Sequence, residues 1–203
     1  MKESYNYLLN KVLSTRNARL EAYRRNQKLQ SLSTYGVAGI SAWTIFLSFY
    51  IAVSKDQQTN LLLGLVGALA SLFILVLSLI DGSKEYSLKA YLFHKCALDL
   101  SPLCIQLQKQ INKQEFDEIR FDEIEKCYEE ILNSYQLNHS QLDYDLYIVK
   151  YPEHLQSDSY LKIQILRSLY KFFIDVKVYF IYYFIISLLL IATVFLFYRM
   201  VIT

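Results

Sequence analysis

The chain has 203 residues, 54% of them hydrophobic, and a formal net charge of +2 at pH 7. The hydrophobic share exceeds that of ordinary soluble domains, and the excess lies in three blocks without charged side chains, residues 33–53, 61–80 and 178–198. A helix rises about 1.5 Å per residue and the hydrocarbon core is about 30 Å thick, so each block is long enough to span a bilayer. The composition therefore excludes an ordinary soluble domain and predicts an all-α membrane protein with three spans.

Residues 1–32 predict a basic amphipathic helix, because residues 4–30 contain no glycine or proline and apolar residues recur at helical spacing. The recurring apolar residues are Tyr5, Leu8, Leu9, Val12, Leu13, Leu20 and Tyr23. Four arginines stand out on this helix: Arg16, Arg19, Arg24 and Arg25. Two interpretations remain open for them. They either only set topology and touch anionic lipid, or they also receive an anionic ligand or a partner protein.

The distribution of basic residues also predicts the orientation of the chain. The first 32 residues lack an apolar core long enough for a cleaved signal peptide, so the first span is expected to act as the insertion signal. Loop 54–60 carries only Lys55, offset by Asp56. Because short basic flanks stay in the cytoplasm, the N-terminus and residues 81–177 are predicted to be cytoplasmic.

Residues 33–80 predict a two-span transmembrane hairpin with small and hydroxyl residues at spacings of three and four, which let helices approach closely in lipid. These are Ser41, Thr44, Ser48, Gly64, Gly67, Ser71 and Ser78. Either they form a tight hairpin contact, or their hydroxyls line a water-filled path. Three helices are too few to enclose such a path, so the second interpretation requires a homo-oligomer. Charges are absent from the three spans, which argues against proton relays, voltage sensing and ion-coupled transport.

Asp81 and Gly82 follow the second span directly. They either mark the membrane surface or form a hinge between the hairpin and the cytosolic region. Gly82 is the last glycine of the chain, so residues 81–177 are predicted to be almost entirely helical.

The expected helices of this region cover residues 86–114, 115–136 and 159–175, with an irregular segment at 138–158. Pro102 is expected to kink the first of them or to start a new helix. The last segment, residues 178–203, is predicted to be a transmembrane helix that faces lipid and anchors the chain.

The sequence contains only weak signals for catalysis or metal binding. Cys96, Cys104 and Cys127 lack CxxC spacing and are expected to be reduced. HExxH, GxSxG and glycine-rich phosphate loops are missing from the sequence. His139 and Asp143 would share a helical face, but a structural or surface role is favoured over a metal site. We therefore expect no catalytic residue, no cofactor, no metal and no direct nucleic-acid binding, and a membrane-embedded enzyme acting on lipids or nucleotides is the third-ranked hypothesis.

Three segments, "TRNARLEAYRRNQK", "DGSKEYSLKAYLFHKCALDLSPL" and "NHSQLDYDLY", together with a two-span hairpin, resemble the prokaryotic SLATT family over residues 5–150. SLATT proteins are two-span effector domains associated with nucleotide-second-messenger synthases and SLOG sensors, and in some branches with reverse transcriptases. The resemblance implies an anti-phage effector in the bacterial inner membrane that halts growth of the infected cell by forming a pore or disrupting the membrane. A nucleotide signal or a partner protein (nucleotidyltransferase, SLOG protein or reverse transcriptase) would trigger it. The alternative is a non-conducting scaffold or anchor for such a cytosolic partner. The third span is an addition to the minimal two-span pattern.

Overall fold

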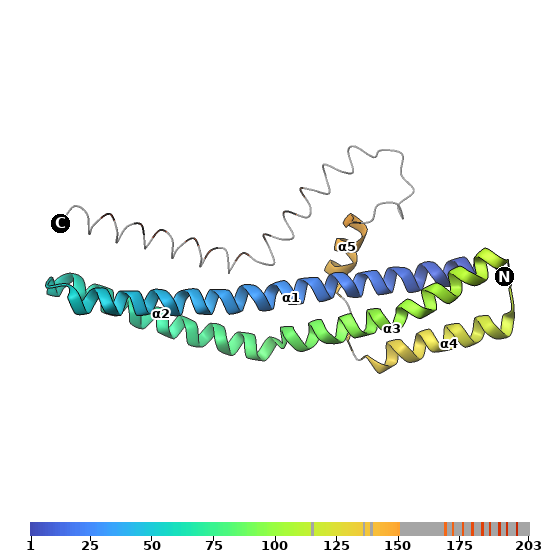
Figure 1. Ribbon diagram of the computed structural model, residues 1–203, viewed down its shortest axis with the longest axis horizontal. Helices are drawn as coiled ribbons and strands as arrows, with labels where there is room; N and C mark the ends of the chain where they lie inside the picture. The colour runs from blue at the N-terminus through green and yellow to red at the C-terminus, as the bar shows by residue number, and fades with distance from the viewer. Residues whose placement is uncertain are drawn as a thin grey trace. The chain divides into compact units, whose positions relative to one another are not determined.

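A computed structural model of the chain describes residues 1–114, 116–135, 137–138 and 140–150 continuously, and beyond them only single positions. All regular structure in these continuous ranges is helical (Figure 1). The helices are α1 (Lys2–Val53), α2 (Gln57–Lys84), α3 (Tyr86–Lys113), α4 (Glu118–Ser134) and α5 (Gln141–Lys150). The prediction of an all-α fold is confirmed for this part. The helix predicted at 159–175 and the third span lie outside the continuously described residues.

The described helices form two compact units. One, which we call the head, consists of Met1–Gln27 of α1 together with α3, α4 and α5. The other, which we call the hairpin, is Lys28–Glu85 and contains the rest of α1 and α2. Helix α1 therefore contributes to both units.

Most buried residues of α1 form a stripe with spacings of three, four or seven positions, as in a coiled-coil seam, and Ala18 and Glu21 are buried beside it. Its buried members are Tyr5, Leu8, Val12, Arg19, Ala22 and Asn26 in the head, and Leu29, Ser33, Ile40 and Leu47 in the hairpin. The helix predicted from the recurrence of apolar residues is present, and three of these residues, Tyr5, Leu8 and Val12, are buried. The polar members Arg19, Asn26 and Ser33 are unusual at such positions and lower stability unless they are paired.

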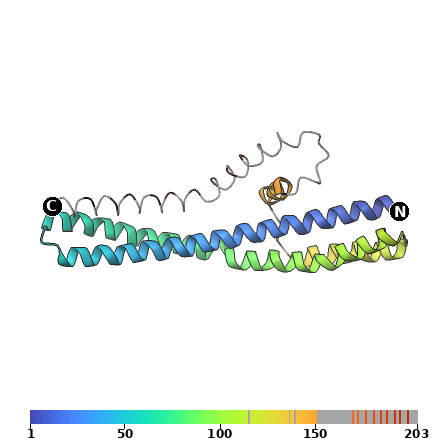
Figure 2. The same ribbon diagram turned by 45° about the horizontal axis from the view of Figure 1, so that its top comes forward.

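The core of the head joins α1, α3 and α4. Tyr5, Leu8 and Val12 of α1 pack with a stripe of α3 and with α4. The members from α3 and α4 are Cys96, Leu100, Leu103, Cys104, Leu107, Ile124 and Tyr128. In both views α3 and α4 lie side by side (Figures 1 and 2). The Tyr5 hydroxyl donates to the Asp117 carbonyl oxygen at 2.8 Å, which ties the start of α1 to the start of α4.

The helix boundaries in the head follow local signals. Helix α4 begins after Asp117, whose carboxylate accepts a hydrogen bond from the Ile119 amide at 3.1 Å. Pro102 lies inside α3 on its exposed side, and the helix continues through it, so it does not start a new helix. The irregular segment predicted at 138–158 is wrong over Gln141–Lys150, which form α5. At the start of α5 the Ser140 amide donates to Asp143 Oδ2 at 2.9 Å, which is one of the two hydrogen bonds of a capping box.

The hairpin has an internal apolar contact and a large apolar exterior. Ile40 of α1 packs against Leu77 of α2, with Val37, Ala70 and Ile74 around them. Large apolar side chains elsewhere on the two helices are exposed, among them Phe46, Phe49, Leu65, Leu72 and Leu79. Both helices are long and apolar enough to cross a membrane. This exterior suits a lipid environment, because such a continuous apolar surface is unfavourable in water.

Candidate functional site

The four arginines singled out in the sequence have different environments in the head. Arg25 forms a side-on ion pair with Asp143 of α5, with Nε donating to Oδ1 at 2.7 Å and Nη2 to Oδ2 at 3.1 Å. The Asp143 side chain is fully buried, and it also accepts from Ser140 Oγ at 2.7 Å. The guanidinium of Arg25 is therefore satisfied inside the chain, and its partner cannot move without leaving a buried charge.

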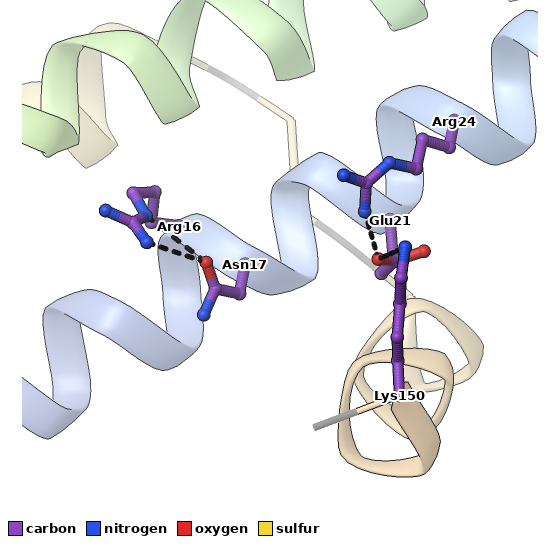
Figure 3. A network of polar contacts seen from close by, with 5 residues as sticks. All are labelled: Arg16, Asn17, Glu21, Arg24 and Lys150. Atoms are coloured by element: carbon purple, nitrogen blue, oxygen red, sulfur yellow. Dashed lines mark hydrogen bonds and ion pairs between the residues drawn. The ribbon is translucent and has the colours of Figure 1, made fainter.

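A second ion pair fixes the other end of α5. Lys150 Nζ donates to Glu21 Oε1 at 3.0 Å, and Arg24 Nη1 donates to the same oxygen (Figure 3). The side chains of Arg24 and Lys150 are 46% and 43% exposed. We call the pairs Arg25–Asp143 and Lys150–Glu21 the latch, because they bind the first turn and the end of α5 to α1.

Arg16 and Arg19 take no part in the latch. Arg16 donates from Nε and Nη2 to Asn17 Oδ1 at 3.2 and 3.1 Å (Figure 3). Arg19 is only 2% exposed, and its Nε and Nη1 have no hydrogen-bond partner. It is the one member of the four whose buried donors are left unsatisfied within the described part of the chain.

Both arginines act on cysteines of α3. Burial raises the pKa of the Cys96 thiol, and the nearby Arg19 charge opposes that rise. Burial likewise raises the pKa of the Cys104 thiol against the charge of Arg16. A raised pKa favours the protonated form of both thiols, which disfavours a role as nucleophile.

A groove of about 590 Å³ lies between α3 and α4 and was not anticipated from the sequence. Its lining mixes cations and carboxylates, including Asp99, Lys109, Arg120 and Glu123. At its edge Asp99 accepts a hydrogen bond from the Tyr135 hydroxyl. Desolvation, and secondarily Asp99, raise the pKa of Tyr135 to about 12. The mixed charge gives no preference for a ligand of one sign.

Groups of three or more histidine, cysteine, aspartate or glutamate side chains suited to a metal ion are missing from the described residues. His94 stacks on Tyr23 with 4.7 Å between ring centroids, while His139 lies outside the described residues. Asp143, considered above with His139 as a possible pair, is instead bound to Arg25. The expectation that the chain uses no metal or cofactor stays a prediction.

The small residues of the hairpin lie outside or at the edge of its internal contact. Ser48, Gly64, Ser71 and Ser78 are exposed, and Ser41, Thr44 and Gly67 are partly exposed. A Cβ added to Gly64 or Gly67 would meet no atom within 4 Å. The hydroxyls of Ser41, Thr44, Ser48 and Ser71 donate to carbonyls of their own helices at 2.8–2.9 Å. Their role in contacts between copies stays a prediction.

Asp81 and Gly82 lie inside the last turns of α2, and a Cβ at Gly82 would meet open space. The helix ends at Lys84, and Glu85 adopts a left-handed conformation with φ of 51°. The break between α2 and α3 is therefore at Glu85, while the hinge role of Asp81 and Gly82 stays a prediction.

The comparisons with known proteins agree with the membrane character of the hairpin. The family described as SMODS and SLOG-associating 2TM effector domain family 5 matches residues 1–199. No curated protein and no solved structure matches the chain. Because the match spans nearly the whole sequence, and because two apolar helices with lipid-compatible exteriors are present, the chain belongs to SLATT family 5, a family of two-span membrane effector domains rather than a known enzyme family.

Proposed function

We propose that the chain is a membrane effector of a bacterial anti-phage system whose hairpins assemble into a pore, or disrupt the inner membrane, once the head receives a signal. One observation supports the assembly of several hairpins. Gly64, Ser71 and Ser78 recur every seven residues and are all exposed, while other residues make the contact between α1 and α2. Seven residues are about two helical turns, so the three lie on one face. Small residues on one exposed face favour helix association in lipid, here with a second copy of the chain.

The charges of the chain support one orientation for this effector. In it the basic start of α1 lies in the cytoplasm, and the connection between α1 and α2 faces the other side. The head is then available to a nucleotide signal or to a nucleotidyltransferase, SLOG protein or reverse transcriptase. Any such signal shifts the equilibrium between the resting and the assembled state only by its difference in affinity for these two states. The latch would stabilise the resting state, so such a signal would have to overcome these two ion pairs.

Dye uptake after induction in bacteria tests this function. Wild type is compared with Ser71→Leu, at an exposed position, and with Gly67→Leu, where an added Cβ would meet no atom within 4 Å in the single chain. Val76→Leu, also at an exposed position of α2, is the matched control for added bulk. Wild type and Val76→Leu are expected to admit the dye, and the other two variants to admit much less. Equal uptake by all four proteins would overturn the contact between copies.

The second candidate is a non-conducting scaffold that anchors a cytosolic partner, and the groove between α3 and α4 favours it as a place for that partner to bind. A scaffold would leave liposomes tight under all conditions while still retaining the partner. Liposome leakage therefore separates the two functions.

A further inference from the structure

Arg19 is a buried cation that has no acidic partner among the described residues. It is 2% exposed, and its Nε and Nη1 have no hydrogen-bond partner in that part of the chain. Arg25, six residues further along the same helix, has its Nε and Nη2 edge filled by Asp143. The described part of the head therefore provides a carboxylate for Arg25 and leaves Arg19 without one.

This arrangement is unfavourable for the head by itself. A guanidinium keeps its proton at any accessible pH, so Arg19 cannot relieve its burial by becoming neutral. Asp99, whose charge acts on the same Cys96 thiol as that of Arg19, accepts the Tyr135 hydroxyl instead. The missing acceptor is thus not supplied by the described part of the head.

We propose that Arg19 receives a phosphoryl group of an anionic ligand, with Arg16 one turn away as the second cation, and that the ligand reaches it when α1 and α3 move apart. The Nε and Nη1 donors lie on different edges of the guanidinium plane, so one carboxylate bound along one edge leaves one of them unsatisfied. A phosphoryl group or diphosphate offers three or more oxygens in several directions. This proposal rests on the proposed function and names the class of ligand that would trigger it.

The place of Arg19 on α1 favours a soluble ligand over a lipid head group. Arg19 and Ser33, the first residue of the apolar block, are 14 residues apart. Along one helix this is about 21 Å, whereas the head-group region of each leaflet is only about 5–8 Å thick. A phospholipid head group also carries a phosphoryl group. The experiment therefore tests a soluble ligand and a lipid in separate arms.

Thermal unfolding of the full chain in maltoside micelles, which contain no phosphate, is the test. One arm adds inorganic pyrophosphate and the other adds phosphatidylglycerol, each against sodium chloride of equal ionic strength to remove general screening. Arg19→Gln is compared with the wild type, and Arg24→Gln is the matched control because it removes the same charge from an exposed position of α1.

At a pyrophosphate concentration about 100 times the dissociation constant, the wild type and Arg24→Gln are expected to gain about 5 °C in Tm, and Arg19→Gln to gain nothing. An Arg19-dependent gain with phosphatidylglycerol alone would support the phosphoryl site but overturn the soluble source. An equal response of Arg19→Gln and Arg24→Gln in both arms, or no response of the wild type, would overturn the site.

A second variant, measured without any ligand, tests whether the buried charge of Arg19 is unfavourable for the head. Replacing a buried, unpaired charge by an apolar side chain of similar length removes an unfavourable group, so Arg19→Met is expected to have a Tm at or above that of wild type. A fall of about 5 °C or more would show that Arg19 is a structural element of the head and would contradict the proposal. Neither measurement requires leakage, so the failure of this site and the failure of the proposed function are distinguishable.

Discussion

Arg25 and Asp143 are 118 positions apart in the sequence and form a side-on ion pair at 2.7 and 3.1 Å between α1 and α5. The carboxylate has no exposed surface, and it also accepts the Ser140 amide at the start of α5. One residue therefore both starts α5 and binds it to α1. This makes Asp143 the strongest single point of the latch.

Asp143→Asn is expected to destabilise the head by about 3–5 kcal/mol, because it leaves the Arg25 guanidinium without its charged partner. The measurement is chemical unfolding in micelles, followed by helix content. The double variant Arg25→Met with Asp143→Leu is the control, since removing both charges restores much of the loss. A loss below about 1 kcal/mol for Asp143→Asn would show that the pair contributes no more than a surface ion pair.

Lys150→Ala is expected to cost less than about 1 kcal/mol, because the lysine is 43% exposed and solvent screens its pair with Glu21. Its effect should also shrink as salt is raised, whereas the effect of Asp143→Asn should not. Unfolding curves at low and high sodium chloride compare the two variants. A larger loss for Lys150→Ala than for Asp143→Asn would reverse the order of the two halves of the latch.

Leu107→Ala is expected to destabilise the head by about 2–5 kcal/mol, because Leu107 is fully buried in the core formed by α1, α3 and α4. Ile105→Ala is the matched control on the same helix, since Ile105 is 65% exposed. It should change stability by about 0.5 kcal/mol or less. Thermal unfolding distinguishes them, and similar losses for both would mean that α3 packs through a different face.

Gly82→Ala is expected to stabilise α2 by about 0.5–1 kcal/mol, since the added methyl meets open space and alanine favours a helix. Glu85→Gly is the complementary change, because glycine adopts the left-handed conformation of Glu85 without strain. Both proteins should show a higher Tm than wild type. A lower Tm for Gly82→Ala would show that α2 does not remain helical through residue 82.

The sequence predicted the apolar face of α1 in the head, because such a face depends only on helical periodicity within one segment. Tyr5, Leu8 and Val12 recur at helical spacing and are buried. Partners of charged residues are a non-local property, and no spacing rule connects Arg25 with Asp143. The signal for α5 was nevertheless present, since Ser140 and Asp143 have the separation of a capping box.

Non-local partners also limited what the sequence could predict for the hairpin. Small residues at spacings of three and four indicated a close helix contact of α2. The internal hydrophobic contact includes Ala70 and the larger Ile74 and Leu77, whereas Gly64 and Ser71 are exposed. Periodicity identifies a face, whereas the choice between a contact within one chain and a contact between chains depends on the shape of the partner.

Dye release from liposomes tests whether opening the latch permeabilises the membrane. Purified wild type, Asp143→Asn, and Asp143→Asn combined with Ser71→Leu are reconstituted at equal protein-to-lipid ratio, with carboxyfluorescein inside. Asp143→Asn is expected to release dye faster than wild type, because the latch is opened, and adding Ser71→Leu is expected to abolish the release. Liposomes that stay as tight with Asp143→Asn as without protein would contradict this expectation.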